Sequence, residues 1–231
     1  MRHHIRLDLT IRFESKWRIG SGEGSLLVDR LITKDARNQP YIPGSTLKGL
    51  VRESCEKLSR TLGFEFPPAD PHQKDLRLQD AFKPLDAHRS PVDRLFGTVY
   101  QGGDLYFRNV SLKQDAPYRA IGNQSRVCKD RILGTAKKGH LFSSEYVAPL
   151  DFKTKITGWH QNLVGLEELD PPYAYCLLIA GLMKVERIGG DRSTGSGEVR
   201  IMIDNIVYNG RQVAMETVFE YLDAEMYKET R

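Results

Sequence analysis

The chain begins with a strict alternation of hydrophobic and polar positions. The hydrophobic members are Ile5, Leu7, Leu9, Ile11 and Phe13, and the polar residues between them are Arg6, Asp8, Thr10 and Arg12. A period of two is that of a strand with one buried face. The pattern therefore predicts a half-buried β-strand over residues 5–13.

Three later segments repeat their hydrophobic residues every three or four positions, which is the period of an amphipathic helix. The first, residues 47–62, places Leu47, Leu50, Val51, Cys55 and Leu58 on one side. The second covers residues 174–187 through Leu178, Gly181, Leu182 and Val185. The third covers residues 213–228 through Met215, Val218, Phe219, Leu222 and Met226. We predict a helix over each.

Shorter strand patterns lie between these helices, over residues 104–112, 146–156 and 198–206, with a short extended piece near Leu31 and Ile32. Strands alternating with two central helices favour an α+β fold of the ferredoxin-like kind. We predict that residues 1–231 form a single domain. Residues 64–94 interrupt the pattern, because polar sequence there is broken by prolines, and they are predicted to form an inserted lid.

Composition and charge narrow the class of protein. The chain has 231 residues, of which 40% are hydrophobic, enough for a sizeable core. No apolar stretch approaches the ~20 residues of a membrane span, and residues 1–6 lack the apolar run of a secretory signal. The three cysteines are far apart in sequence, so we expect a reducing cytoplasm and no structural metal.

The net charge of +4 is unevenly distributed. Residues 213–231 hold five acids against two bases, so the rest of the chain is more basic than the total suggests. Residues 126–138 form a polar, loop-like segment with five cations against one acid. This distribution permits a polyanionic partner without requiring one.

Residues 41–52 combine features of a phosphate-binding corner. Pro43 and Gly44 form a turn, after which Ser45 or Thr46 can cap the start of a helix whose first amide groups favour an anion. Two cations, Lys48 and Arg52, lie four residues apart and hence on one helical face.

A glycine-rich loop over residues 188–199 is the second candidate site, because glycines let a backbone approach phosphates closely. Its members are Gly189, Gly190, Arg192, Ser193, Gly195 and Gly197. The glycines follow a helix and lead into a strand, the reverse of a dinucleotide-binding fingerprint, and the chain has no Walker-type motif. Nucleotide hydrolysis therefore has little support.

Together, the segments at residues 42–52 and 189–199 resemble the two hallmarks of the RAMP superfamily of CRISPR-associated proteins. Residues 29–35, 95–97 and 131–142 further resemble the repeated backbone subunit of type III effector complexes, of the Csm/Cmr kind, which act in antiviral defence. The resemblance implies a modified ferredoxin-like, or RRM-like, palm. It also implies the lid at residues 64–94 and a basic thumb hairpin around residues 113–145.

The resemblance also implies partners and roles. The partners would be a guide RNA (crRNA), a complementary target RNA, further copies of the chain and other effector subunits, with no membrane. The guide backbone would be held by Ser45, Thr46, Lys48, Arg52, Gly189, Gly190, Arg192, Ser193, Gly195 and Gly197. Arg126, Lys129 and Arg131 would also bind RNA, and they would lie in or near the thumb that separates guide from target. Binding of this kind tracks phosphates, while base pairing supplies the specificity.

In the resembling subunits an aspartate ahead of the Pro-Gly turn cuts the target RNA with a divalent metal ion such as Mg²⁺, and Asp29 matches it. One carboxylate can suffice, because RNA carries its own nucleophile, the 2′-hydroxyl. The neighbouring Asp35 is explained by turn chemistry, and His140 is predicted to be structural.

Two alternatives remain open at this point. The chain could be a guide-binding backbone subunit without cleavage activity, or a stand-alone endoribonuclease that processes the guide precursor. His72 and His88 in the predicted lid suggest zinc, but no cysteine lies in that segment, and a zinc site needs about four ligands. We predict the metal-dependent target-RNA endonuclease subunit.

Overall fold

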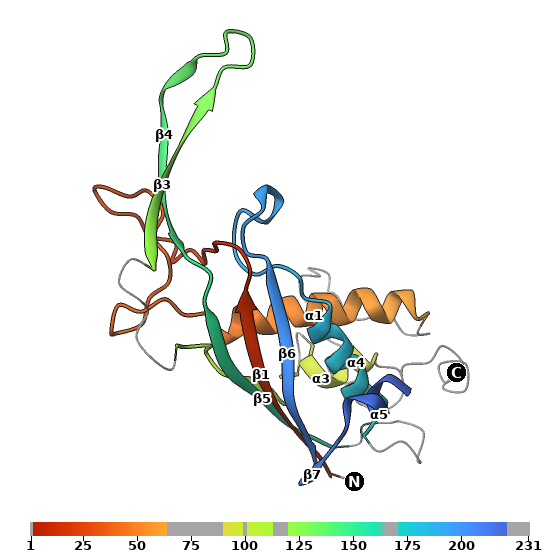
Figure 1. Ribbon diagram of the computed structural model, residues 1–231. Helices are drawn as coiled ribbons and strands as arrows, with labels where there is room; N and C mark the ends of the chain where they lie inside the picture. Colours follow the sequence, from red (N-terminus) through yellow and green to blue (C-terminus); the bar gives the residue numbers. More distant parts are fainter. Residues whose placement is uncertain are drawn as a thin grey trace.

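The computed structural model describes residues 2–63, 90–98, 101–112, 120–161, 163 and 171–220. Its centre is a five-stranded antiparallel sheet in the order β2-β5-β1-β6-β7 (Figure 1). The strands are β1 (Arg2–Phe13), β2 (Leu105–Phe107), β5 (Asp151–Gln161), β6 (Val199–Tyr208) and β7 (Arg211–Gln212).

The predicted first strand is confirmed, and it is the middle strand of the sheet. Leu7 lies opposite Ile156 of β5 on one side and Ile206 of β6 on the other. Odd-numbered β1 residues from Ile5 to Phe13 are buried, since their side chains point to the face that the helices cover.

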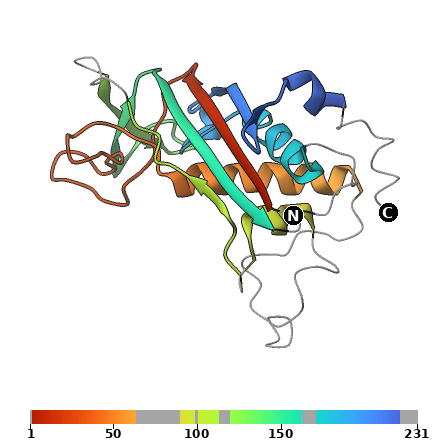
Figure 2. The ribbon, with the colours of Figure 1, turned by 90° about the horizontal axis from the view of Figure 1, so that it is seen from below.

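Helices cover one face of this sheet (Figure 2). They are α1 (Gly44–Thr61), α3 (Pro91–Phe96) and α4 (Tyr173–Met183), and α5 (Met215–Glu220) contacts α4. The α1 and α4 helices cross closely, because a Cβ atom at Gly181 would lie 2.3 Å from Cys55 Sγ. No helix within the described ranges is long and apolar enough to cross a membrane.

Helix boundaries differ from the prediction, beginning with α1, which starts at Gly44, three residues before the predicted start. The α4 helix ends at Met183, four residues before the predicted end, because the chain must leave the helix to enter the glycine loop. The helix predicted over residues 213–228 is described as far as residue 220, and within that part α5 begins at Met215.

Without the hairpin and α3, the chain order is β1-α1-β2-β5-α4-β6. Across the sheet these four strands lie in the order β2-β5-β1-β6, which is 2-3-1-4 when they are numbered along the chain. This is the βαββαβ arrangement of a ferredoxin-like fold, so the predicted α+β class is confirmed.

A two-stranded antiparallel hairpin projects from this domain (Figure 1). It consists of β3 (Ile121–Lys129) and β4 (Ala136–Val147). Two expectations are therefore corrected: residues 126–138 are strand ends joined by a turn, and residues 146–156 are divided between β4 and β5. Hydrophobic periodicity misses this hairpin because water reaches both faces over much of its length, while backbone pairing needs no buried side.

Most of the predicted lid, residues 64–89, lies outside the described residues, as do His72 and His88. Its last five residues belong to the core. Ser90 caps α3 by accepting hydrogen bonds from the amides of Val92 and Asp93, and Val92 is fully buried.

Candidate nucleic-acid interface

At the predicted phosphate-binding corner, other parts of the chain pack against the start of α1. The helix begins at Gly44, with Pro43 in the capping position, so the prediction that Ser45 or Thr46 caps it is wrong. The Gly44 amide donates to Asn109 Oδ1 at 2.9 Å. Gly44 is required there, because a Cβ atom would lie 2.2 Å from the Phe107 carbonyl oxygen.

Arg52 is bound within the fold. Its Nε lies 2.8 Å from Glu56, its Nη2 lies 3.4 Å from Asp93 of α3, and its Nη1 donates to the Gly97 carbonyl at 2.9 Å. The side chain is only 15% exposed. Arg52 therefore joins α1 to α3, and these contacts compete with any role in holding phosphate.

Lys48 points toward the sheet, with its Nζ 3.5 Å from the Leu105 carbonyl oxygen of β2. Partial burial lowers the pKa of this amine, and neighbouring Arg52 lowers it further. The two predicted α1 cations thus face β2 and α3.

The glycine loop packs on another side of α1. Arg192 and Ser193 line a groove of about 690 Å³ with Glu53 and Lys57 of that helix. The structure therefore does not bring the Lys48 side of α1 and the glycine loop together as a single phosphate-binding site.

Two glycines of this loop are required by its packing on the chain itself. Gly189 has φ 101°, and a Cβ atom there would lie 2.3 Å from the Arg18 carbonyl oxygen. Gly197 has φ 78°, and a Cβ atom would lie 2.2 Å from the Ile188 carbonyl oxygen. The Gly190 amide donates to Arg18 O at 2.8 Å. In contrast, Gly195 has open space around it.

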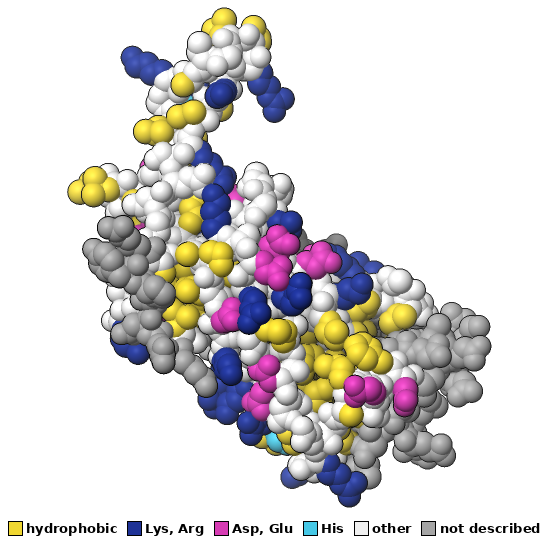
Figure 3. Space-filling view, in the orientation of Figure 1, with side chains coloured by type: hydrophobic (Ala, Val, Ile, Leu, Met, Phe, Trp, Pro, Cys, Tyr) yellow, Lys and Arg dark blue, Asp and Glu magenta, His cyan; other side chains and the backbone are white. Residues whose placement is uncertain are grey.

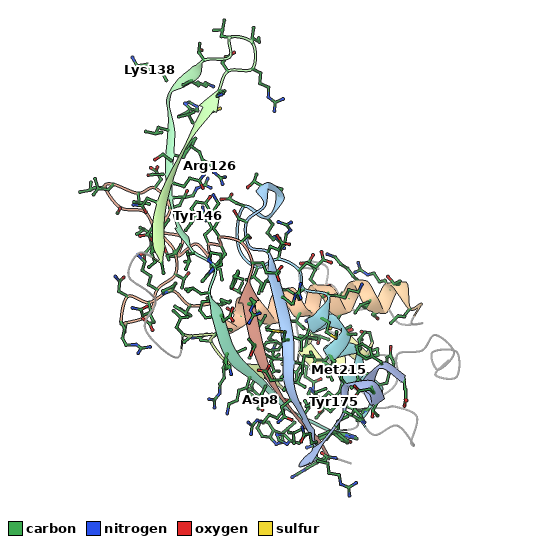
Figure 4. The ribbon with its side chains drawn as sticks, viewed as in Figure 1. Asp8, Arg126, Lys138, Tyr146, Tyr175 and Met215 are labelled. Carbon is green, nitrogen blue, oxygen red and sulfur yellow. The ribbon has the colours of Figure 1, made fainter. Side chains whose placement is uncertain are left out.

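Where the glycine loop meets the hairpin, five residues form what we call the hairpin-base cluster: Lys16, Arg18, Arg126, Tyr146 and Asp191. The Tyr146 hydroxyl donates to the Asp191 carboxylate. Arg126 and Arg18 approach the same carboxylate at 3.5 and 3.9 Å. Lys16 Nζ lies 5.0 Å from the centre of the Tyr146 ring. Figure 4 shows Arg126 and Tyr146 together at the root of the hairpin.

The protonation states make this cluster positive. The hydrogen bond from Tyr146, followed by Arg126 and Arg18, lowers the pKa of Asp191. Burial and the Asp191 carboxylate raise the pKa of Tyr146, so the phenol stays neutral. The cluster therefore holds three cations, Lys16, Arg18 and Arg126, against one carboxylate, and the excess positive charge suits a phosphate backbone.

Asp29 lies at the edge of β4, on the side to which the Ser143 side chain points. Its carboxylate Oδ2 accepts from the Ser143 amide at 2.7 Å and from Ser143 Oγ at 2.9 Å. Ser143 and Tyr146 are an odd number of positions apart on β4, so their side chains point to opposite faces. On the Ser143 side, Lys34 pairs with Glu145 at 2.9 Å. The hairpin base is thus held between residues 29–34 and the glycine loop.

The Asp29 carboxylate is exposed and ionised. Hydrogen bonds from the Ser143 amide and hydroxyl lower its pKa. Within the described ranges no group of three or more His, Cys, Asp or Glu side chains could hold a metal ion. Mg²⁺ commonly takes one or two carboxylates and completes its shell with water and substrate phosphates. Asp29 fits such an ion if RNA supplies the other ligands.

Further cations continue along the hairpin, where Figure 3 shows Lys and Arg side chains projecting from both sides. They are Lys129, Arg131, Lys137 and Lys138, all exposed. Ile132 and Leu133 at the turn are also exposed, at 94% and 73%. The hairpin thus extends the positive surface of its base.

Sequence reasoning missed Tyr146, Asp191, Arg18 and Ser143. Asp191 carried a signal in the sequence, because it is an acid inside a loop otherwise suited to anions. In the structure it adopts the left-handed conformation, with φ 59°. Tyr146 had no local signal, since its partners are distant in sequence.

A ferredoxin-like domain with a projecting basic hairpin has the charge distribution of a nucleic-acid-binding protein. The model of the RAMP superfamily matches residues 10–200, which is more than half of the chain, and the chain therefore belongs to the RAMP superfamily. Members of this superfamily generally bind CRISPR RNA within multi-subunit complexes. No curated protein matches the sequence.

Proposed function

We propose that this chain is the guide-RNA-binding filament subunit of a type III CRISPR effector that cleaves complementary target RNA. The observation that carries the proposal is the arrangement at the hairpin base. A cationic cluster lies on one face of β4, and an exposed, anchored aspartate lies on the other. A hairpin placed between guide and target would present these two surfaces to different strands.

On the guide side, the hairpin-base cluster and the glycine loop provide the phosphate contacts. Arg126 and Lys16 lie along the Tyr146 ring, which fixes their direction, and Arg192 and Ser193 are available on the adjoining groove. None of these contacts requires a particular base, which suits a subunit that repeats along any guide sequence.

On the target side, Asp29 is the candidate catalytic residue. Ser143 holds its carboxylate in place and keeps it ionised, so it acts as a fixed negative ligand rather than as a proton acceptor. The target's own 2′-hydroxyl would attack the adjacent phosphorus and break its bond to the 5′-oxygen, giving a 2′,3′-cyclic phosphate and a 5′-hydroxyl. Solvent water would take the proton from the 2′-hydroxyl and supply the proton to the leaving 5′-oxygen. A divalent metal ion at Asp29 would stabilise negative charge on the scissile phosphate.

The proposal is tested with the assembled complex, complementary RNA and Mg²⁺. We expect cleavage at regular intervals, and its loss in Asp29→Asn and Asp29→Ala while RNA binding is retained. Ser143→Ala should slow cleavage without abolishing it. Asp151→Asn, which changes an exposed acid of the sheet paired with Arg12, is the matched control and should cleave normally.

The outcomes separate the alternatives. Regular cleavage that survives Asp29→Ala would remove the catalytic assignment. No cleavage by the native complex would favour a backbone subunit without activity. Cleavage of guide precursor by the isolated chain, without a target, would favour the processing endoribonuclease.

A further inference from the structure

The face of the sheet opposite the helices carries an unexplained group of aromatic residues. Helices α1, α3 and α4 lie on the other face (Figure 2). Trp159 of β5 and Tyr106 of β2 are each 57% exposed. With His4 of β1 they form what we call the sheet-face aromatic patch. Exposed tryptophan is costly in a soluble domain, so such a group suggests a ligand.

Strand register builds this patch. His4 lies directly opposite Trp159, and their rings stack with centroids 4.7 Å apart and planes 26° apart. Tyr106 lies opposite Thr157, and its ring meets the Trp159 ring edge-on at 6.1 Å. Backbone pairing fixes all three positions, so the patch exists before any ligand arrives.

Cations flank the patch on the same face. Arg2 and Arg6 alternate with His4 along β1, and Lys155 alternates with Trp159 along β5. The nearest acid of this face, Asp8, is already bound by Arg6 at 3.0 Å and lies opposite Lys155. Asp104 adjoins Trp159 through its backbone, but its charge acts on Lys48, toward α1.

We propose that the sheet-face aromatic patch is a second RNA site, which stacks unpaired bases of single-stranded RNA on Trp159 and Tyr106. Aromatic side chains with flanking cations bind single strands without sequence preference, because every base has a π face. A protein partner is less favoured, since the outward neighbours are Thr157, Arg6 and Lys155 rather than the uncharged core typical of protein interfaces.

This site is separate from the one proposed for the guide. The patch lies near the start of β1, whereas the hairpin-base cluster lies beyond its end, at Lys16 and Arg18. The two sites can therefore fail or succeed independently in experiments.

Tryptophan fluorescence reports directly on the patch. The chain has two tryptophans, and Trp17 is only 1% exposed, packed on Phe13 and Phe152. Titration with a short single-stranded oligouridylate should quench the Trp159 emission to saturation. Trp159→Phe should lose this signal. Arg126→Ala should leave the quenching unchanged, which separates this test from that of the guide site.

Affinity for the same oligonucleotide provides the second measurement. Trp159→Ala and Tyr106→Ala should each weaken binding about tenfold, and Trp159→Phe should retain most of it. Phe219→Ala, which removes an aromatic ring 49% exposed on α5, is the matched control and should bind normally.

Unchanged Trp159 emission at saturating oligonucleotide, or unchanged affinity in Trp159→Ala, would overturn the proposal. Loss of assembly with other chains in Trp159→Ala, with RNA affinity intact, would assign the patch to a protein contact and would also overturn it.

Discussion

The cations of α1 and those of the hairpin show how differently the same residue types are used in one chain. Arg52 is 15% exposed and bound to two carboxylates and a carbonyl, and Lys48 is half-buried against β2. Arg131 and Lys129 stand on a projecting hairpin, fully open to solvent. The sequence motif favoured the α1 pair, but the structure makes the hairpin cations the more available to RNA.

The difference teaches that a cation's partners, rather than its motif, decide its role. A guanidinium whose donors are used within the fold contributes to stability, and turning it toward phosphate would take one charged partner away from the buried Asp93. An exposed lysine on a hairpin loses little when it meets phosphate, and it gains from counterion release. Each of the following variants tests one side of this comparison.

The largest effect is expected for Arg52→Ala. Removing the guanidinium leaves Asp93, only 5% exposed, without this partner, and breaking such a buried pair costs about 3 kcal/mol. Urea unfolding measures the loss. Lys57→Ala breaks an exposed pair with Glu53 and should cost well under ~1 kcal/mol. Intact stability in Arg52→Ala combined with lost RNA binding would reverse our assignment of Arg52.

Next in size is a pair of glycine variants in the same loop. Gly189→Ala combines positive φ with a Cβ atom 2.3 Å from Arg18 O, and we expect a loss of about 2 kcal/mol or more. Gly195→Ala has φ 86° but open space, so only the backbone strain of about 1 kcal/mol applies. Thermal unfolding compares them. Equal losses would show that packing against residues 16–18 contributes little.

Smaller effects are expected on the hairpin. Arg131→Ala should leave stability unchanged and weaken RNA binding a few-fold. Loss of one phosphate contact should reduce the magnitude of the slope of log K against log salt concentration by about 0.7 for single-stranded RNA. Affinity measured across a salt series checks this, with Arg200→Ala, an exposed arginine paired with Glu14, as control. An unchanged slope in Arg131→Ala would remove the hairpin turn from the RNA contact surface.

The smallest effect concerns pH. The folded pKa of Asp191 is lowered by Tyr146 and the neighbouring arginines, so its stabilising contribution is complete above the unfolded value of about 3.9. It is lost as pH falls through the lowered folded pKa. The stability difference between the native chain and Asp191→Asn should therefore shrink below about pH 4. Urea unfolding across pH 7 to 3 measures it, and a constant difference would contradict the role given to Asp191.

Local pattern predicted much of the fold. The alternation in residues 5–13 identified β1, and the helical repeat identified α1, because each of these elements buries one regular face. The repeat also identified α4, although that helix is buried on nearly all sides. The hairpin was predicted only through family resemblance. Its strands are exposed to solvent on both faces for much of their length, so their sequences show no hydrophobic periodicity.

The candidate site was predicted in part. Asp29, Arg126 and the glycine loop are brought to the hairpin base, whereas the Lys48 and Arg52 side chains are directed at β2 and α3. Ser45 and Thr46 lie in the first turn of α1. A capping role for Ser45 or Thr46 failed because the helix begins before them, at Gly44, with Pro43 in the capping position. Asn109, distant in the sequence, accepts from the Gly44 amide.

By itself, the sequence determined the periodic elements, the ferredoxin-like class and the membership of a family, since these depend on short-range pattern and motif. Only the tertiary structure decided which cations are free to meet RNA. It also placed Asp29 and the hairpin-base cluster on opposite faces of one strand. The reason is physical: the partners that fix a side chain's charge and direction, such as Ser143 for Asp29 and Asp191 for Arg126, come from elements far apart in the chain.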